Sequence, residues 1–208
     1  MIQAIDTSLI SFSEFLDWIP EDGRQYELHS GVVVEMQPTG SHELVGAFIA
    51  EELTLHIRQH ALPYVIPKSC LLKPYLPDSG YRPDVILLNK TELQNEPLWA
   101  SSSTVQQGQT IPLVVEVVST HWRDDDGHKL VEYEVMGITE YWIVDFRALG
   151  AVRYIGHPKQ PTITVCQLVD GEYQMQRLVS GQVLQSSVLH DFELAVDVVF
   201  DAAAFSDS

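Results

Sequence analysis

Segment 111–145, IPLVVEVVSTHWRDDDGHKLVEYEVMGITEYWIVD, constrains the fold of this chain more than any other stretch. Its first part, 111–118, is apolar and β-branched, which is typical of a buried strand, yet Glu116 lies in the middle of it. A helix is predicted from about 125 to 136, and a second apolar strand at 140–145. A buried carboxylate is costly unless something pairs with it. We therefore expect the rest of the fold to supply a partner for Glu116.

The other segments predict a mixed α/β (α+β) domain. Helices are expected at 11–19, capped by Ser11 or Ser13, and at 41–61, capped by Ser41. The remaining expected elements are a hairpin across 24–38, strands at 64–74 and 82–88, a surface excursion at 89–110, short antiparallel strands at 151–156, 162–169 and 173–180, and an amphipathic segment of ambiguous type at 192–200.

Length and composition narrow the classes of protein. A chain of 208 residues suits one domain, 1–208, with a frayed tail at about 201–208. No apolar run is long enough to span a bilayer, and the first residues do not resemble a secretory signal. Two separated cysteines are typical of small buried hydrophobic residues in a reducing compartment, so we expect a cytoplasmic protein.

The net charge of −17 bears on possible partners. The chain has 12 Lys and Arg against 29 Asp and Glu, whereas nucleic-acid binders usually carry a basic patch. This balance argues against tight non-specific DNA binding. It does not argue against a metal site that touches a phosphate locally, and the acidity is also explained by solubility alone.

Two carboxylates are candidates for a metal site. Asp84 stands at the start of the apolar strand 82–88, and Glu116 interrupts a second apolar strand. Carboxylates on neighbouring strands repel each other unless a cation or a shared proton lies between them, and oxygen ligands suit Mg²⁺ or Mn²⁺. The alternatives are a strand-end Asp84 that accepts backbone N–H groups and a Glu116 that forms a salt bridge with an arginine or lysine.

Helical spacing adds further candidates. Asp125, Lys129 and Tyr133 are each four residues apart and share one helix face, although Asp125 and Lys129 could form only a solvated pair. Glu27 lies in a strand-like run, and its alternative is an outward-facing residue of the hairpin, since alternation cannot fix which face is buried. His42 lies near the start of the helix at 41–61. It is either a surface residue of the first turn or a residue that points at a ligand, and the sequence alone favours the surface position.

Several motifs taken together resemble the Uma-type restriction-endonuclease family of the PD-(D/E)XK nuclease superfamily. The resemblance spans nearly the whole chain. It is carried by Tyr26-Glu27-Leu28 with Gly31, Pro38 with His42, Arg82-Pro83-Asp84-Val85, Val115-Glu116-Val117-Val118-Ser119, Asp125 with Lys129, Tyr133 and Gly137, and Glu140-Tyr141-Trp142-Ile143-Val144-Asp145.

The resemblance implies a restriction-endonuclease-like core, with a mixed central β-sheet flanked by helices. It also implies that Pro83-Asp84 is the PD element and that Asp84 and Glu116 are metal ligands, with Glu27 as an early acidic residue that helps to hold the metal. The superfamily has a lysine two residues after its acidic position, where this chain has Val118. The resemblance suggests Lys129 as the replacement. Ser119-Thr120-His121 also stands where the family commonly has a Ser-Pro turn.

The leading hypothesis is therefore a Mg²⁺- or Mn²⁺-dependent endonuclease that hydrolyses DNA phosphodiester bonds as a homodimer. Asp84 and Glu116 would hold the ion, Glu27 would assist, and Lys129 would orient a water or stabilise the transition state. The alternative is a non-catalytic binding or regulatory protein on a nuclease scaffold, which Val118 and the net charge favour. Hydrolysis of another phosphoester would use the same site.

Overall fold

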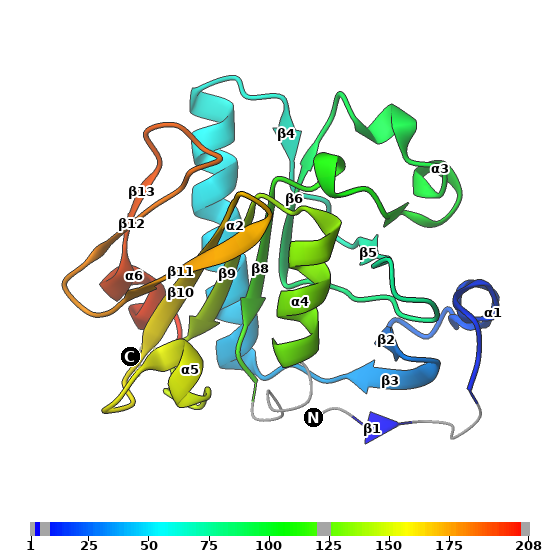
Figure 1. Cartoon of the computed structure of the whole chain (residues 1–208), viewed down its shortest axis with the longest axis horizontal. Coiled ribbons are helices and arrows are strands. Elements are labelled where there is room, and N and C mark those ends of the chain that lie inside the picture. The colour runs from blue at the N-terminus through cyan, green and yellow to red at the C-terminus, as the bar shows by residue number, and fades with distance from the viewer. Residues whose placement is uncertain (1–2, 5–8, 120–125, 205–208) are drawn as a thin grey trace.

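A six-stranded mixed sheet forms the centre of the protein. The structure is a computed structural model that describes residues 3–4, 9–119 and 126–204. The strand order is β11-β10-β9-β8-β6-β4, in which only β8 and β9 are parallel neighbours (Figure 1). These strands are β4 (Tyr64–Val65), β6 (Val85–Asn89), β8 (Leu113–Val117), β9 (Glu140–Asp145), β10 (Thr162–Val169) and β11 (Glu172–Leu178).

Helices α2 (Gly40–Gln59) and α4 (Asp126–Met136) cover opposite faces of this sheet (Figure 1). The alternating side chains of β8 belong to two separate cores for this reason. Val115 packs in the core that contains the buried residues of α2, and Val114 packs in the core that contains Leu130 of α4. The predicted class, a mixed sheet flanked by helices with added antiparallel strands, is confirmed.

A three-stranded antiparallel sheet lies beside the central one. It consists of β1 (Gln3–Ala4), β3 (Val32–Met36) and β2 (Gln25–His29), and α1 (Phe12–Trp18) packs on it. Leu28 bridges to Gly80, where an added Cβ would lie 2.7 Å from the Phe12 ring. This close approach fixes β2 against the segment before β6 and buries Glu27.

Shorter elements complete the described chain. Among them, β12 and β13 form a hairpin and β5 and β7 form a parallel pair. They are β5 (Leu71–Leu72), η1 (Leu93–Asn95), α3 (Trp99–Ser102), β7 (Thr104–Val105), η2 (Gly108–Thr110), α5 (Val152–Ile155), β12 (Val183–Gln185), β13 (Glu193–Ala195) and α6 (Val196–Asp201). No helix among the described residues is long and apolar enough to cross a membrane.

Four local expectations are wrong. Segment 151–156 is not a strand, because it forms the helical turn α5, and a run this short does not separate the two periodicities. The strand expected at 64–74 is two short strands in different sheets. The cap of α2 is Thr39, whose hydroxyl accepts the backbone N–H of His42, and it is not Ser41. Segment 89–110 is more than a surface excursion, since it contributes the buried pair of β7.

The C-terminal segment is ordered further than we expected. The segment at 192–200 divides between β13 and α6. The backbone N–H groups of Ala202, Ala203 and Ala204 donate to carbonyls of the preceding turn, and Ala203 packs against the core. Residues 205–208 lie outside the described residues, so the fraying expected there stays a prediction.

Candidate active site

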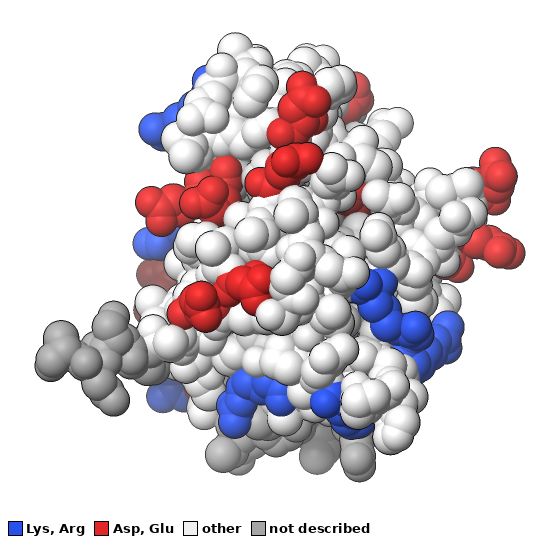
Figure 2. Space-filling view, turned by 90° about the vertical axis from the view of Figure 1, so that its left-hand side faces the viewer, with Lys and Arg blue, Asp and Glu red and all other residues white. Residues whose placement is uncertain are grey.

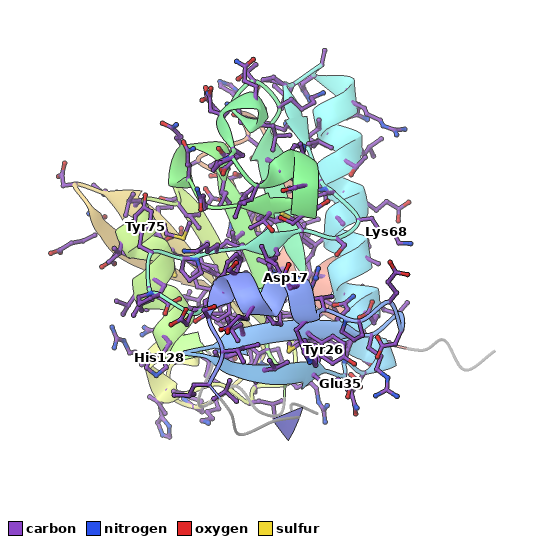
Figure 3. The ribbon with its side chains drawn as sticks, turned by 90° about the vertical axis from the view of Figure 1, so that its right-hand side faces the viewer. Asp17, Tyr26, Glu35, Lys68, Tyr75 and His128 are labelled. Carbon is purple, nitrogen blue, oxygen red and sulfur yellow. The ribbon has the colours of Figure 1, made fainter. Side chains whose placement is uncertain are left out.

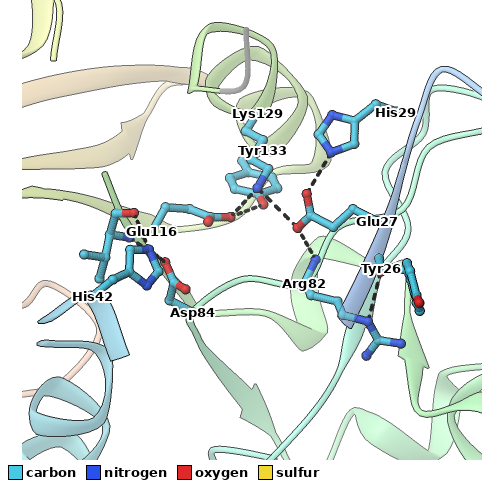
Figure 4. Close-up of polar contacts among 10 residues, drawn as sticks. Tyr26, Glu27, His29, His42, Arg82, Asp84, Glu116, Lys129 and Tyr133 are labelled. Atoms are coloured by element: carbon cyan, nitrogen blue, oxygen red, sulfur yellow. Dashed lines mark hydrogen bonds and ion pairs between the residues drawn. The ribbon is translucent and has the colours of Figure 1, made fainter. Parts of the chain in front are cut away.

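Glu116 receives both of its partners from α4. Its Oε1 atom accepts a 2.8 Å hydrogen bond from the Tyr133 hydroxyl and lies 3.3 Å from Lys129 Nζ (Figure 4). Lys129 and Tyr133 are four residues apart, so both point from one helix face to the same carboxylate. The ion pair that we gave as the alternative for Glu116 therefore exists, and its cation is the lysine that the resemblance suggested.

Glu27 anchors the other side of Lys129. Its carboxylate is fully buried, with Oε1 3.4 Å from Lys129 Nζ and accepting the backbone N–H of Arg82 at 2.7 Å. Its Oε2 lies 2.8 Å from His29 Nε2. Burial by itself would raise the pKa of Glu27, but the Lys129 charge and the His29 hydrogen bond outweigh it and lower that pKa to about 2. Glu27 is thus an ionised buried residue, and the outward-facing alternative is wrong.

Lys129 lies in the interior with carboxylates on two sides. Its residue surface is 1% exposed, and the ammonium also stands 5.1 Å from the centre of the Tyr81 ring. The solvated alternative for Lys129 is therefore wrong. Asp125, its expected neighbour on the helix face, lies outside the described residues. Val118, at the usual lysine position, is buried in the core on the α4 side.

Asp84 and His42 form a second group, which contacts the backbone of Val117, the residue after Glu116. Asp84 Oδ2 accepts the backbone N–H of Val117 at 2.7 Å and lies 3.4 Å from His42 Nε2. The same Nε2 lies 2.8 Å from Val117 O, so it faces two acceptors and carries the ring proton that it donates. His42 is buried, and the surface alternative is wrong. Asp84 does accept a backbone N–H group, as its alternative required.

Asp84 is the more accessible of the two predicted metal ligands. Its side chain is 23% exposed, against 10% for Glu116. Loss of hydration raises the pKa of Asp84, and the nearby His42 opposes this shift only in part. The two carboxylates also make different contacts, since Glu116 meets Lys129 on the α4 side and Asp84 meets His42 on the α2 side.

A pocket of about 760 Å³ opens beside Asp84 along α2. Its lining includes His42, Arg82 and Asp84 at the end near the sheet, and residues 66–70 form part of its wall. Figure 3 shows Lys68 beside α2, on this side of the molecule. The pocket gives solvent and ligands access to Asp84.

The donor atoms fit a hard divalent cation. Asp84 and Glu116 offer oxygen atoms only, which suits Mg²⁺ or Mn²⁺ better than a metal that prefers sulfur or nitrogen. Within residues 9–119 and 126–204, no group of three or more His, Cys, Asp or Glu side chains is arranged to hold a metal ion. Mg²⁺ commonly binds through one or two carboxylates together with waters and substrate phosphates. Asp84 at the open pocket, with Glu116 on the neighbouring strand β8, offers such carboxylates.

Three residues around Glu27 were not identified from the sequence. His29 lies two residues after Glu27 in β2, and this spacing, which puts both side chains on one face, was the available signal. Arg82 donates from Nε to Tyr26 O at 3.1 Å and from Nη1 to Ser69 Oγ at 2.7 Å, besides its backbone bond to Glu27. Tyr81 and Arg82 come from the segment before β6, and no local pattern links them to Glu27.

Comparison with known proteins agrees with this geometry. Residues 12–197 match the Uma2 family, described as "Putative restriction endonuclease". No curated protein matches the chain. A crystal structure from Anabaena variabilis ATCC 29413, described as "a putative nuclease belonging to DUF820", aligns with a TM-score of 0.68 at 14% identity, over 94% of this chain and 99% of that chain. The structural likeness confirms the fold. The family match, over residues 12–197, covers most of the sequence.

Proposed function

Because the chain belongs to the Uma2 family, whose description supports a nuclease, we propose that it is a metal-dependent endonuclease that hydrolyses DNA phosphodiester bonds. The observation that carries the proposal is the position of Lys129, whose ammonium lies 3.3 Å from Glu116 and 3.4 Å from Glu27. This arrangement supplies the cation that Val118 does not, next to the strand that carries a predicted metal ligand.

Asp84 and Glu116 are the proposed ligands of Mg²⁺ or Mn²⁺. A bound ion of this kind lowers the pKa of a coordinated water and polarises a phosphoryl oxygen. Asp84 is presented to the pocket by Val117 N–H and His42, which hold its Oδ2 atom in place. Tyr133 donates to Glu116 Oε1 and so directs that carboxylate.

Lys129 is the proposed electrostatic catalyst. Two carboxylates favour its charged form, and a fixed ammonium stabilises the negative charge that develops on a phosphate during attack by water. Glu27 has a positioning role in this scheme, because its oxygens already pair with Lys129, His29 and the Arg82 backbone. The sequence-based expectation that Glu27 assists the metal is thereby replaced by a role in holding Lys129.

A second candidate is a non-catalytic binding or regulatory protein on the same scaffold. The burial of Val118 in an apolar core favours it, since the usual position of the lysine cannot supply a cation. The homodimer and the cytoplasmic location stay predictions under either function. Hydrolysis of a phosphoester other than duplex DNA stays open as well.

Cleavage assays distinguish these functions. Supercoiled plasmid and single-stranded DNA are incubated with Mg²⁺ or Mn²⁺ and wild-type protein, Glu116→Ala, Lys129→Ala or Asp84→Asn. We expect wild-type nicking that chelation of the metal abolishes and that each variant loses by about 100-fold or more. Glu172→Gln, an exposed change in β11, is the control. Activity that survives Glu116→Ala would rule out the mechanism, and an inactive wild-type protein would favour the non-catalytic candidate.

A further inference from the structure

One part of this acidic chain contains basic residues and no acidic ones. Between Phe146 and Val169 there is no aspartate or glutamate, while Arg147, Arg153 and Lys159 all occur there. The whole chain has 29 acidic residues against 12 lysines and arginines, so a segment of this length without any acidic residue differs in charge from the rest of the chain. A local positive surface is what a protein of net charge −17 needs in order to approach a polyanion.

The sheet topology places these residues at the edge of the sheet where β8, the strand that contains Glu116, ends. Strands β8 and β9 are parallel, with Val117 opposite Val144, so both strands end at the same edge. Arg147 follows directly after β9. Strand β10 starts at this edge with Thr162 opposite Asp145, just after Lys159.

A fourth basic residue joins from β11. Arg177 lies opposite Thr164, near the end of β11 at this edge. Its guanidinium donates to Tyr154 O at 3.0 Å and to Arg153 O at 2.5 Å, which fixes α5 beside it. We call Arg147, Arg153, Lys159 and Arg177 the basic edge, and all four residues are exposed.

Two nearby acidic groups have neutral hydrogen-bond donors as partners. Asp145 is fully buried, and its carboxylate accepts the backbone N–H groups of Arg147, Leu149 and Gly150. Asp197, beyond the end of β11, is bonded to Ser180 and Gly181. In Figure 2, which faces the side with α5 and α6, blue side chains gather at the bottom and lower right, and the red ones lie above them.

We propose that the basic edge binds the phosphate backbone of DNA on one side of the bond that the candidate active site cleaves, an inference that rests on the proposed function. Strands β8 and β11 are three strand spacings apart, or about 14 Å. A DNA strand advances about 3.4 Å per phosphate, so the basic edge reaches phosphates roughly four nucleotides from the candidate site. Separate exposed cations along one edge suit a repeating polyanion better than a small anion, which needs a closed pocket.

The test is a comparison of two double variants with the same change in charge. Arg147→Gln/Lys159→Gln removes two charges from the basic edge. Lys73→Gln/Lys90→Gln is the matched control, because neither residue lines the pocket beside Asp84. Lys73 lies over the Phe12 ring, and Lys90 follows β6, which runs antiparallel to β8. Binding of a fluorescent DNA duplex is followed by anisotropy with EDTA present, so that no cleavage takes place, between about 50 and 200 mM salt.

The expected result is a weaker and less salt-dependent complex for the basic-edge variant. Loss of two phosphate contacts reduces the slope of log K against log salt by about 2 and lowers the affinity at least about tenfold. The control pair stays within about twofold of wild type. Urea unfolding of each variant checks that the fold is retained, and the single variants Arg147→Gln and Lys159→Gln should each give about half of the change in slope.

The outcomes separate this inference from the nuclease proposal. If wild type binds the duplex and the basic-edge variant alone loses binding, the basic edge is supported even when plasmid cleavage fails. If wild type cleaves plasmid but the basic-edge variant binds with unchanged slope, the basic edge is wrong and the nuclease proposal stands. A wild-type protein that does not bind duplex at the lowest salt overturns the basic edge outright, as does equal loss in both double variants.

Discussion

The candidate active site has two parts that differ in their contact with the pocket along α2. The buried cluster, Glu27, Glu116, Lys129 and Tyr133, lies outside the pocket lining, is almost fully buried and is joined by short polar contacts. The open pair, His42 and Asp84, meets the pocket along α2. Charges inside a protein are tolerated only when paired, whereas a partly hydrated carboxylate keeps some of its freedom.

This difference separates residues that the fold depends on from residues that it does not. Each member of the buried cluster pairs with the charge or polar group of another member, so removing one side chain leaves an unpaired buried group. Asp84 has the opposite effect on stability. Loss of hydration raises its pKa, so its ionised form costs the folded state free energy at neutral pH. Stability should therefore follow the buried cluster, and substitutions in the open pair should affect ligand binding and activity.

Lys129→Met should have the largest effect on stability. The change leaves Glu27 and Glu116 buried without their shared cation, and breaking a buried ion pair in this way costs about 3–5 kcal/mol. Urea unfolding at neutral pH measures the loss. Lys90→Met, at an exposed position, is the control and should change stability by less than about 0.5 kcal/mol. A Lys129→Met protein as stable as the control would show that the cluster is not a unit of stability.

Glu27→Gln should remove a pH dependence of stability in acid. The folded-state pKa of Glu27 is about 2 against an ordinary value of 4.5, so its contribution is complete above about pH 4.5 and is lost as the pH falls through about 2. The shift corresponds to about 3 kcal/mol.

The measurement is the difference in unfolding free energy between wild type and Glu27→Gln at pH values across this window. That difference should shrink by about 3 kcal/mol from the upper to the lower limit. Glu172→Gln, which removes an exposed carboxylate, is the matched control. A difference that stays constant with pH would contradict the ion pair of Glu27.

Tyr133→Phe should have an intermediate effect. Its hydroxyl donates to the ionised Glu116 at 2.8 Å, and a hydrogen bond to a charged group contributes about 2 kcal/mol. Tyr173→Phe is a close control, because the Tyr173 hydroxyl donates to a neutral acceptor, Ile138 O, at 2.9 Å and should cost about 1 kcal/mol. Thermal or urea unfolding compares the two. Equal losses would mean that the charge of Glu116 adds nothing to its bond with Tyr133.

Asp84→Asn should change stability least, by less than about 1 kcal/mol. The amide oxygen can still accept the Val117 N–H, and the substitution removes an ionised form that burial disfavours. Nicking of plasmid DNA should nevertheless fall by about 100-fold or more if Asp84 holds the metal. A variant that loses stability as Lys129→Met does would erase the distinction between the buried cluster and the open pair.

Several elements could be predicted because their signals are local. The strand at 140–145 matches β9, the strand at 111–118 contains β8, and the apolar run at 82–88 overlaps β6. Strongly patterned segments of this kind bury one or both faces in any compact fold. Glu116 was identified for the same reason, since a carboxylate in an apolar run demands a partner whatever the topology.

Elements with weak patterns were predicted less well. Segment 151–156 is too short to distinguish a strand from a helical turn, and it forms α5 after the turn that Asp145 organises at the end of β9. Thr39 and Ser41 are equally plausible caps by residue type, and the path of the chain into α2 decides between them. His29 is one of several polar residues in the hairpin until Glu27 is known to face inwards.

The amino-acid sequence by itself determined that Glu116 needs a partner and that Lys129 and Tyr133 share a helix face. Only the tertiary structure decided that the cation is Lys129, because its contact with Glu27 joins residues 102 positions apart. The sequence also contains a segment without acidic residues. Its place at the edge of the sheet where β8 ends follows from strand order and direction, which no local pattern encodes.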